Sequence, residues 1–432
     1  MTTTYFFQLA RAIFVLLSGG AIASSLHGQA IIGTAAGLNG SSANGSTPWA
    51  SASSTGLGAP LSAVASALTR TGPLFQAGSI EVRPHVSYQW VEGTDILVAP
   101  GAADKITTQS MSAGVLLNLG ARSSADYTFS RTYYSTDRLA DTSDHNVRVS
   151  TGLTQGEWKT GLSGSYGTSS NILAETGRQT RDETYATSAN VSHEIGRATE
   201  IEASLSNAIR SASAIRGSAG WNGTDWTSWS AVSRVRHHLS KQLNASGGIE
   251  ATYDVIQGSP DMSSWGPKVD LNWNPTQKLS FSADLGLIRH STKATPVYTQ
   301  NFWTYAVSGS YSPLATTTFS ISGQRSINAS YFGQAIQGDT WTASVRQRLL
   351  TRFFLSAVYS HSYSNLHFTT STTIARFPDR IDRGNSFHTS LSTALFGRAY
   401  FSVFYQRGQN QSNDRLFGYS NHQIGASVSY SF

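Results

Sequence analysis

Cysteine and charge are the two features that this chain most clearly lacks. Its 432 residues contain no cysteine, which excludes disulfide frameworks and thiolate metal sites. Charged residues make up 13%, where about 25% is typical, and hydrophobic residues reach only 39%. The formal net charge of +6 is scattered without a run of lysine or arginine, so no nucleic-acid partner is expected.

Long hydrophobic runs are also missing, apart from a short one near the N-terminus. Residues 12–17 are apolar, follow Arg11 and lead to the small-residue sequence GQA at 28–30. The run is shorter than the roughly 20 residues that a membrane-spanning helix needs. The pattern predicts a cleaved export signal over residues 1–30, with a short membrane anchor as the alternative.

The next segment, residues 31–79, is low in complexity. Its part 33–63 reads "GTAAGLNGSSANGSTPWASASSTGLGAPLSA" and is dominated by glycine, serine, alanine and threonine. Such a composition cannot bury enough apolar surface to order itself. We therefore predict a flexible periplasmic leader over 31–79, followed by one large domain over 80–432.

From residue 80 onward, apolar and polar residues alternate. Every second residue of "IEVRPHVSYQW" (80–90) is apolar or aromatic, and the same period recurs in "KLSFSADLGL" (278–287) and "FHTSLSTAL" (387–395). A period of two is the signal of a β-strand. Long connections, such as the one expected over 168–183, alternate with short ones between the segments, as in barrels that thread up and down through an outer membrane. We predict an all-β fold, a transmembrane antiparallel up-and-down β-barrel of about 18 strands, or 16.

A soluble β-sandwich is the alternative for any single alternating segment. A soluble sheet of so many strands would have to curl or split. Within lipid, a closed barrel satisfies every backbone polar group internally. The number of segments, the export signal and the low charge together favour the barrel.

The strands of such a barrel have one face toward lipid and one toward the lumen. Aromatic residues near strand ends would form two girdles at the membrane interfaces. The residues assigned to these girdles are Trp90, Trp158, Trp273, Trp303, Trp341 and Tyr405. Charged side chains at mid-depth would cost about 2–4 kcal/mol on the lipid face, so they are assigned to the lumen. These lumen candidates are Arg83, Arg148, Arg234, Arg236, Glu250, Asp270, Asp284, Arg346 and Arg348.

Motifs for catalysis and cofactor binding are absent from the sequence. It has no HExxH, no GxSxG and no phosphate-binding loop, and we expect neither enzymatic activity nor a cofactor or metal. The histidines His237, His238 and His361 could be ligands, but polar rim or lumen positions explain them better. The segment "GWNGTDW" (220–226) is interpreted as a loop tip with girdle anchors, and stacking on sugar rings is its alternative role.

The chain ends on a further alternating segment, "IGASVSYSF" (424–432). We expect it to be the last strand and to close the barrel against the strand near 79–90. Tyr430 and Phe432 resemble the terminal signal by which the outer-membrane assembly machinery recognises bacterial barrels. These two residues are therefore predicted to act in insertion.

Three stretches carry a resemblance to a known family. "GSIEVRPHVSYQW", "SMSAGVLLNLG" and "SADYTFSRTYYSTDRLADTSDHNVRVSTGL" resemble the opening of the beta-barrel porin 2 family, and the similarity covers roughly residues 79–432. Members often carry an acidic Asp/Asn pair after the first strand, whereas this chain has only Glu92 and Asp95 near that place. The resemblance implies a porin-like barrel with a role in passing exopolysaccharide across the outer membrane, together with periplasmic export proteins.

The leading hypothesis is thus an outer-membrane conduit of a Gram-negative (diderm) bacterium, embedded in outer-membrane lipid. At about 18 strands a barrel is wide enough for an aqueous channel. A structural or surface-interaction barrel with long binding loops and a plugged lumen is the second hypothesis. A barrel hydrolase is the third.

Overall fold

The computed structural model describes residues 75–94, 105–173, 178–215, 224–293, 298–329, 335–367, 380–414 and 417–431. None of these residues belongs to a helix long and apolar enough to cross a membrane. The predicted export signal, nearly all of the predicted leader and Phe432 lie outside the described residues.

The described residues form nineteen β-strands. Long runs of alternating polar and apolar residues, rich in β-branched and aromatic side chains, explain why these segments are extended. The strands are β1 (Phe75–Ala77), β2 (Ile80–Thr94), β3 (Lys105–Leu119), β4 (Ser123–Tyr134), β5 (Thr142–Gln155), β6 (Trp158–Leu173), β7 (Arg178–Ile195), β8 (Thr199–Ala214), β9 (Thr224–His238), β10 (Leu243–Ile256), β11 (Met262–Thr276), β12 (Leu279–Thr292), β13 (Tyr298–Leu314), β14 (Thr317–Ala329), β15 (Ala335–Leu349), β16 (Phe353–His367), β17 (Arg380–Leu395), β18 (Ala399–Ser412) and β19 (Tyr419–Ser431).

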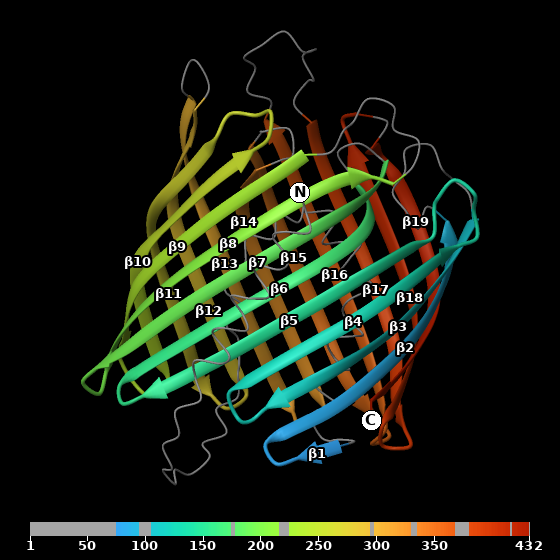
Figure 1. Ribbon diagram of the computed structural model, residues 1–432, viewed down its shortest axis with the longest axis horizontal. Helices are drawn as coiled ribbons and strands as arrows, with labels where there is room; N and C mark the ends of the chain where they lie inside the picture. The colour runs from blue at the N-terminus through green and yellow to red at the C-terminus, as the bar shows by residue number, and fades with distance from the viewer. Residues whose placement is uncertain are drawn as a thin grey trace. The chain divides into compact units, whose positions relative to one another are not determined.

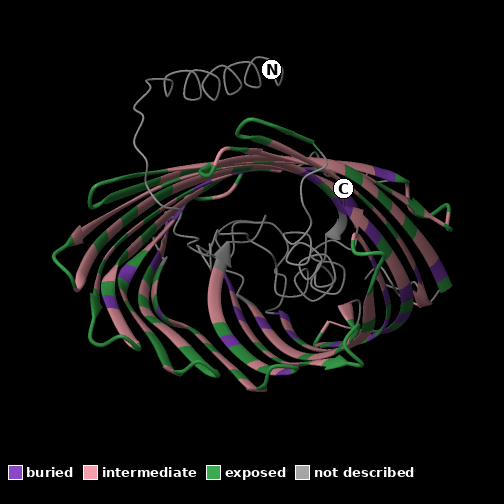
Figure 2. Cartoon of the chain, turned by 90° about the horizontal axis from the view of Figure 1, so that it is seen from below, coloured by how far each residue is buried: buried purple, intermediate pink, exposed green. Residues whose placement is uncertain are grey.

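Strands β2 to β19 form a closed antiparallel barrel. Each strand pairs with its neighbours in sequence, and β19 pairs with β2, with Tyr430 opposite Val86 and Ile424 opposite Glu92. Figure 2 shows the ring that results. The prediction of 18 barrel strands is confirmed, and so is the closure of the last strand against the first. The short strand β1 is an addition that pairs only with the start of β2.

The connections are short at one end of the barrel and longer at the other (Figure 1). We call these the short-turn end and the long-loop end. Glycines such as Gly120 and Gly156, with φ of 74° and 60°, permit the tight turns at the short-turn end. The long connection predicted over 168–183 is reduced to residues 174–177, because β6 and β7 continue further than expected. Residues 168–171 and 178–183 are polar, and the sequence interpretation took this for loop composition.

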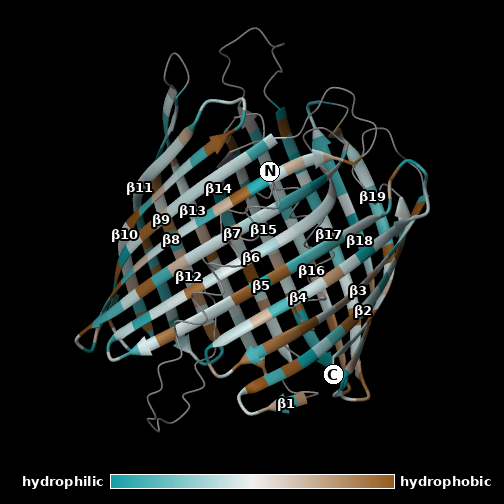
Figure 3. Cartoon of the chain, viewed as in Figure 1, coloured by the Kyte–Doolittle hydropathy of each residue, from teal (hydrophilic) through white to brown (hydrophobic). Residues whose placement is uncertain are grey.

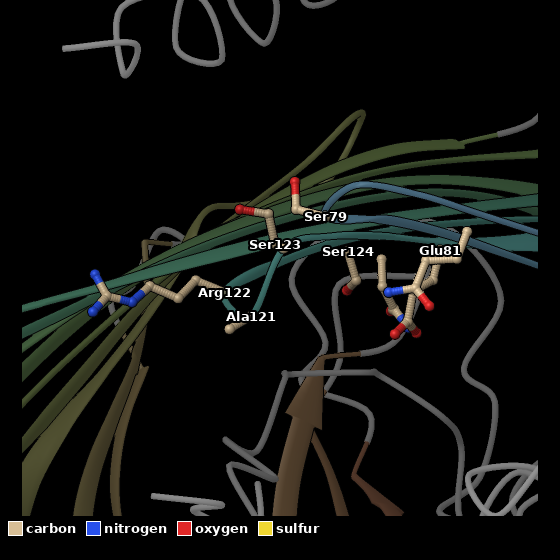
Figure 4. A pocket seen from close by; sticks show the side chains of 9 residues that line it. Ser79, Glu81, Ala121, Arg122, Ser123 and Ser124 are labelled. Carbon is tan, nitrogen blue, oxygen red and sulfur yellow. The ribbon is translucent and has the colours of Figure 1, made fainter. Parts of the chain in front are cut away.

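The register gives the wall two consistent faces. Directly paired residues in an antiparallel sheet share a face, and successive residues of one strand alternate between faces. Glu81 and Ser124 are directed toward the strands of the opposite wall, whereas Ser79 and Ser123 lie on the other side (Figure 4). Following the pairing from Glu81 through all strands returns to the same face of β2. Each residue can therefore be assigned to the inward or the outward face.

The exposed large apolar side chains of the barrel strands are on the outward face, so the protein is not built around a central hydrophobic core. Leu205, Ile249 and Val269 point outward and are exposed by half or more. Figure 3 shows hydrophobic and hydrophilic positions alternating along the strands. The one cluster of buried apolar residues recorded in the described part consists of Trp226, Ile256 and Met262.

Candidate functional site: the inward face of the barrel wall

The outward face defines what surrounds the barrel. Exposed aromatic residues lie near both ends of the strands, among them Trp303 (54% exposed) toward the long-loop end and Trp158 (52%) at the short-turn end. Lipid can cover an apolar outer surface of this kind, and aromatic girdles mark its interfaces. All six residues assigned to the girdles point outward: Trp90, Trp303 and Trp341 in the long-loop half, Tyr405 at the middle of β18, and Trp158 and Trp273 at the short-turn end.

All nine residues assigned to the lumen belong to the inward face by the same register. They do not form one cluster. Five of them, Arg234, Arg236, Glu250, Asp270 and Asp284, come together on β9 to β12. The other four lie elsewhere on the wall: Arg83 on β2, Arg148 on β5, and Arg346 and Arg348 on β15.

The charged residues of β8 to β12 form a continuous ladder, which we call the charged wall. Two rows of cross-strand partners build it, because Glu200 pairs with Arg236 and Glu202 with Arg234, while Asp270 pairs with Asp284 on the next strands. Antiparallel partners lie about 4.5–5.5 Å apart, which is within reach of these side chains. The members are Glu200, Glu202, Arg234, Arg236, Glu250, Lys268, Asp270 and Asp284.

The two arginines of the charged wall each bridge two carboxylates. Arg236 Nη1 lies 2.6 Å from Glu202 Oε1 and 3.4 Å from Glu200 Oε2. Arg234 lies 3.5 Å from Glu202 and 3.3 Å from Asp270. The planar guanidinium suits this double role, since its donors are fixed in a fork. Glu202 thus joins both arginines into one network.

Lysine closes the other half of the ladder. Lys268 Nζ lies 3.1 Å from Glu250 Oε2 and 3.1 Å from Asp284 Oδ2. Ser246 Oγ donates a hydrogen bond of 2.7 Å to Asp270 Oδ2. The three cations therefore lie among five carboxylates in a partly solvated wall, and each carboxylate has at least one cationic neighbour.

Three of the four remaining lumen candidates have local partners of different kinds. Arg83 forms an ion pair of 3.0 Å with Glu81, which also accepts a hydrogen bond from Asn118. Arg346 stacks over Phe354 at 4.7 Å, and Arg348 Nε donates to the carbonyl of Thr351 at the short-turn end. These side chains are isolated cations or pairs, so β2 and β15 carry no ladder like that of β8 to β12.

Hydroxyl groups replace charges on the inward face of β13 to β17. One row of directly paired hydroxyls crosses all five strands, a second row crosses β13 to β15, and one further pair joins β16 and β17; we call this surface the hydroxyl wall. The first row is Ser308, Ser322, Thr342, Ser360 and Ser386, the second is Ser310, Ser320 and Ser344, and the further pair is Ser356 and Ser390. Neighbouring hydroxyls are hydrogen-bonded, for example Ser320 to Ser344 at 2.9 Å and Thr342 to Ser360 at 3.0 Å. Each hydroxyl can donate and accept, so the surface can bind polar solutes without a net charge.

A buried aromatic site on the inward face was missed at the sequence level. Trp226 is 4% exposed, and its Nε1 donates to Asp254 Oδ1 at 3.1 Å, while Arg210 lies 5.4 Å above its ring. The interpretation of 220–226 as a loop tip is wrong for Thr224–Trp226, because β9 begins at Thr224. The alternation of Trp226, Ser228 and Ser230 could have shown this inward position.

The rim at the long-loop end carries a small polar cluster. Tyr253 Oη donates to Asp261 Oδ2 at 2.6 Å, and Lys293 Nζ lies 3.2 Å from Tyr253 Oη and 3.6 Å from Asp261. The hydrogen bond to Tyr253 raises the pKa of Lys293, which therefore stays protonated at neutral pH. The cluster ties the connection after β10 to the end of β12.

The histidines considered as ligands do not converge. His237 and His361 point outward from β9 and β16, whereas His238 points inward. Within the described ranges no group of histidine, aspartate and glutamate side chains could hold a metal ion. A pocket of about 620 Å³ at the short-turn end is lined by Gln76, Glu81, Asn118 and Ser124 among others (Figure 4). It is a polar recess beside β1.

No family model and no curated protein matches the sequence. Solved structures are similar in fold at low identity. The FrpB iron transporter from Neisseria meningitidis (F5-1 variant) has a TM-score of 0.45 at 9% identity, covering 85% of this chain and 84% of that one. The outer membrane protein OpdK from Pseudomonas aeruginosa has a TM-score of 0.42 at 10% identity, covering 82% and 98%. The siderophore receptor PirA from Pseudomonas aeruginosa scores 0.44 at 9% identity, covering 84% and 81%.

Those proteins are an iron transporter, an outer membrane protein and a siderophore receptor, and similarity at this level carries no argument about the function of this chain. The resemblance to the porin 2 family stays a prediction. Function has to be inferred from the two faces of this barrel wall.

Proposed function

We propose that the protein is an outer-membrane barrel of a diderm bacterium that forms a passive aqueous conduit for polar solutes. The supporting observation is the contrast between the two faces of one closed wall. The outward face is apolar with aromatic ends, and the inward face carries the charged wall and the hydroxyl wall. An inward face this polar suits water and hydrophilic solutes, and passage along it needs no cofactor and no covalent step.

The cargo we propose is carbohydrate, with exopolysaccharide moving outward as the specific case. A neutral polysaccharide presents many hydroxyls, and paired serines and threonines offer it donors and acceptors at short intervals. The three cations of the charged wall offset part of the charge of its five carboxylates, which leaves a formal excess of two negative charges spread over β8 to β12. Periplasmic export proteins would deliver the chain to the short-turn end.

Conductance of the purified protein in planar bilayers tests the conduit. We expect steady ion conductance that falls when a neutral oligosaccharide is added to one side. A folded barrel, identified by heat-modifiable gel migration, that carries no current would overturn the conduit. The plugged structural barrel or the barrel hydrolase would then be the function to pursue.

The carbohydrate cargo is tested by changing matched pairs of side chains. Thr342→Val with Ser360→Ala removes a hydrogen-bonded pair of the hydroxyl wall at nearly constant volume. Thr151→Val with Ser123→Ala removes a hydrogen-bonded pair of the same kind, with oxygens 2.8 Å apart, from the outward face. We expect the inward pair to shorten oligosaccharide residence by about fivefold, since one hydrogen bond contributes about 1 kcal/mol. Equal residence times in both variants would contradict the carbohydrate cargo while leaving the conduit intact.

The C-terminal strand supports a proposal about assembly. β19 pairs on both sides, with β18 and β2, and Tyr430 points outward among lipid-facing residues. We infer that Tyr430 and Phe432 form the signal that the assembly machinery reads. Deleting Phe432 should lower the amount of barrel in the membrane far more than it changes the conductance of each barrel. Normal membrane levels of the truncated protein would contradict this role.

A further inference from the structure

Charge is distributed unevenly on the outward face of the strands. Every outward-facing lysine, arginine, aspartate and glutamate of the described strands lies in the half nearer the long-loop end. They are Glu92, Lys105, Arg131, Arg181, Glu183, Asp225, Arg289, Arg325, Asp339, Arg383 and Arg407. The short-turn half carries cations in its turns and none on the outward face of its strands. The two sides of the membrane therefore meet different surfaces.

Most of the outward carboxylates are already neutralised. Glu92 is paired with Lys105, Glu183 with Arg181 at 3.7 Å, and Asp339 with Arg325 at 2.7 Å. Among the described residues no ion pair is formed by Arg131, Arg289, Arg383 or Arg407. Surplus positive charge thus remains on the outside of the barrel.

Two of these arginines lie on neighbouring strands in a part of the outward face that has no carboxylate. Arg383 on β17 pairs with Gln411, and Arg407 on β18 pairs with His422, while Gln409 lies between them on β18. All five side chains are exposed. The described outward face of β16 to β19 holds no aspartate or glutamate. We call these five residues the arginine patch.

The arginine patch lies just beyond the aromatic girdle. Arg407 is two residues past Tyr405, and Arg383 is four residues past Phe387, both toward the long-loop end. Tyr405 and Phe387 are exposed apolar anchors of the outward face. Along the strands, at about 3.3 Å per residue, Arg407 lies about 7 Å beyond Tyr405 and level with its cross-strand partner Phe387. Arg383 lies about 13 Å beyond Phe387. The patch thus begins at the level of the aromatic anchors and extends past them, toward the lipid headgroups.

We propose that the arginine patch binds the phosphorylated headgroups of lipids in the leaflet at the long-loop end. A guanidinium donates two parallel hydrogen bonds to a phosphate, and the amide and imidazole groups nearby can add further donors. The patch points sideways from the wall, so the surrounding lipids are its neighbours, and their anionic groups complement its charge. The proposal rests on the membrane placement of the barrel and is independent of any solute that passes through it.

Native mass spectrometry of the full chain tests the patch. The barrel is released from vesicles of phosphatidylcholine with a minority of phosphatidic acid, and retained lipids are counted. We expect the wild type to retain phosphatidic acid selectively, and Arg383→Gln with Arg407→Gln to reduce that retention by about tenfold, or about 1.4 kcal/mol, because glutamine lacks the charge and the paired donors of a guanidinium. Arg346→Gln with Arg348→Gln is the matched control, because it removes two cations from the inward face.

Three outcomes would overturn the proposal: equal retention in wild type and the Gln variant, equal loss in the control, or displacement of the lipid by dilute inorganic phosphate. The last would indicate a site for free phosphate. Arg383→Lys with Arg407→Lys covers the case in which the Gln variant fails to assemble. It keeps the charge but loses the bidentate fork, so retention should lie between those of wild type and the Gln variant. Conductance in pure phosphatidylcholine bilayers tests the conduit separately.

Discussion

The charged wall and the hydroxyl wall lie on the same face of the same barrel but are held together by different interactions. On β8 to β12, three cations and five carboxylates interlock over several strands. On β13 to β17, hydrogen bonds join hydroxyls in pairs. In the charged wall each side chain depends on its neighbours to balance its charge, whereas a hydroxyl that loses its partner can still bond to water.

This difference predicts that changes to the charged wall spread and that changes to the hydroxyl wall stay local. Removing one partner from a network of charges leaves an uncompensated charge, which costs more than the pair contributed. Removing one serine hydroxyl costs roughly one hydrogen bond at most. Four measurements can break or sharpen the comparison.

The largest expected effect concerns a glycine within the charged wall. Gly248 lies between Arg234 and Lys268, and a Cβ there would overlap the backbone carbonyl oxygen of Ser233 and approach Arg234 Cα to 2.8 Å. Because backbone atoms cannot rotate away, Gly248→Ala must push β9 and β10 apart, at a cost of about 1–3 kcal/mol. We expect a marked loss of assembled barrel, measured by heat-modifiable gel migration.

The hydroxyl side offers the matched control. A Cβ at Gly384 would meet the side-chain hydroxyl of Ser362, which can turn aside, and the next atom is 3.8 Å away. Gly384→Ala should therefore assemble like the wild type. If both variants assemble equally well, β9 and β10 have more room than the structure gives them.

The next effect is on ion selectivity. Replacing Arg234, Arg236 and Lys268 by glutamine leaves the five carboxylates of the charged wall without cations. A surface of one sign raises the local concentration of the opposite ion. The potassium-to-chloride permeability ratio, taken from reversal potentials in a salt gradient, should rise severalfold. The temperature at which half of the protein loses its folded gel migration should fall as well. This temperature can be measured whether or not the barrel conducts ions.

Arg346→Gln controls for the loss of positive charge as such. Arg346 lies on the inward face beside the hydroxyl wall, stacked on Phe354 and with no carboxylate partner among the described residues. Its removal should change the permeability ratio only slightly. An equal change in this variant and in the triple variant would mean that the charged wall has no special effect on passing ions.

The sequence predicted the barrel well because period-two alternation is a local property. Counting alternating segments along the chain predicts the number of strands and the closure of the barrel. The same counting predicts that Arg234 faces inward and Trp303 outward, and the strand register places both side chains on those faces. The charged wall as a connected unit was not predicted. Glu202 and Asp270 are 68 positions apart, and only the pairing of β8 to β11 brings both of them to Arg234.

Local composition misled the interpretation wherever strands continue past the expected membrane. Thr224–Trp226 and much of 168–183 are polar, so they were assigned to loops, yet they are paired strand. Where a strand end extends into water, polar side chains do not destabilise it. Composition alone therefore cannot predict the residue at which strand pairing ends. The arginine patch was missed for a different reason: its members come from three strands, and only the pairing of these strands brings them together.

A smaller effect is expected for one ion pair of the charged wall. A double-mutant cycle with Arg236→Gln and Glu202→Gln measures their coupling in the free energy of unfolding. With side chains 30% and 22% exposed, solvent screens the pair, and we expect a coupling of about 1 kcal/mol. Coupling near zero would show that Glu200 replaces Glu202 when it is lost, and that the network is redundant at this point.

The smallest effect is expected for the corresponding cycle in the hydroxyl wall, with Ser320→Ala and Ser344→Ala. Their oxygens lie 2.9 Å apart, but each hydroxyl can exchange its partner for water when the other is removed. Cross-strand hydroxyl pairs contribute about 0.2–1 kcal/mol, and we expect the low end of that range. The same unfolding measurement applies to both cycles. If the serine coupling equals that of Arg236 and Glu202, the two walls are held together by interactions of equal strength, and the difference between them concerns solutes alone.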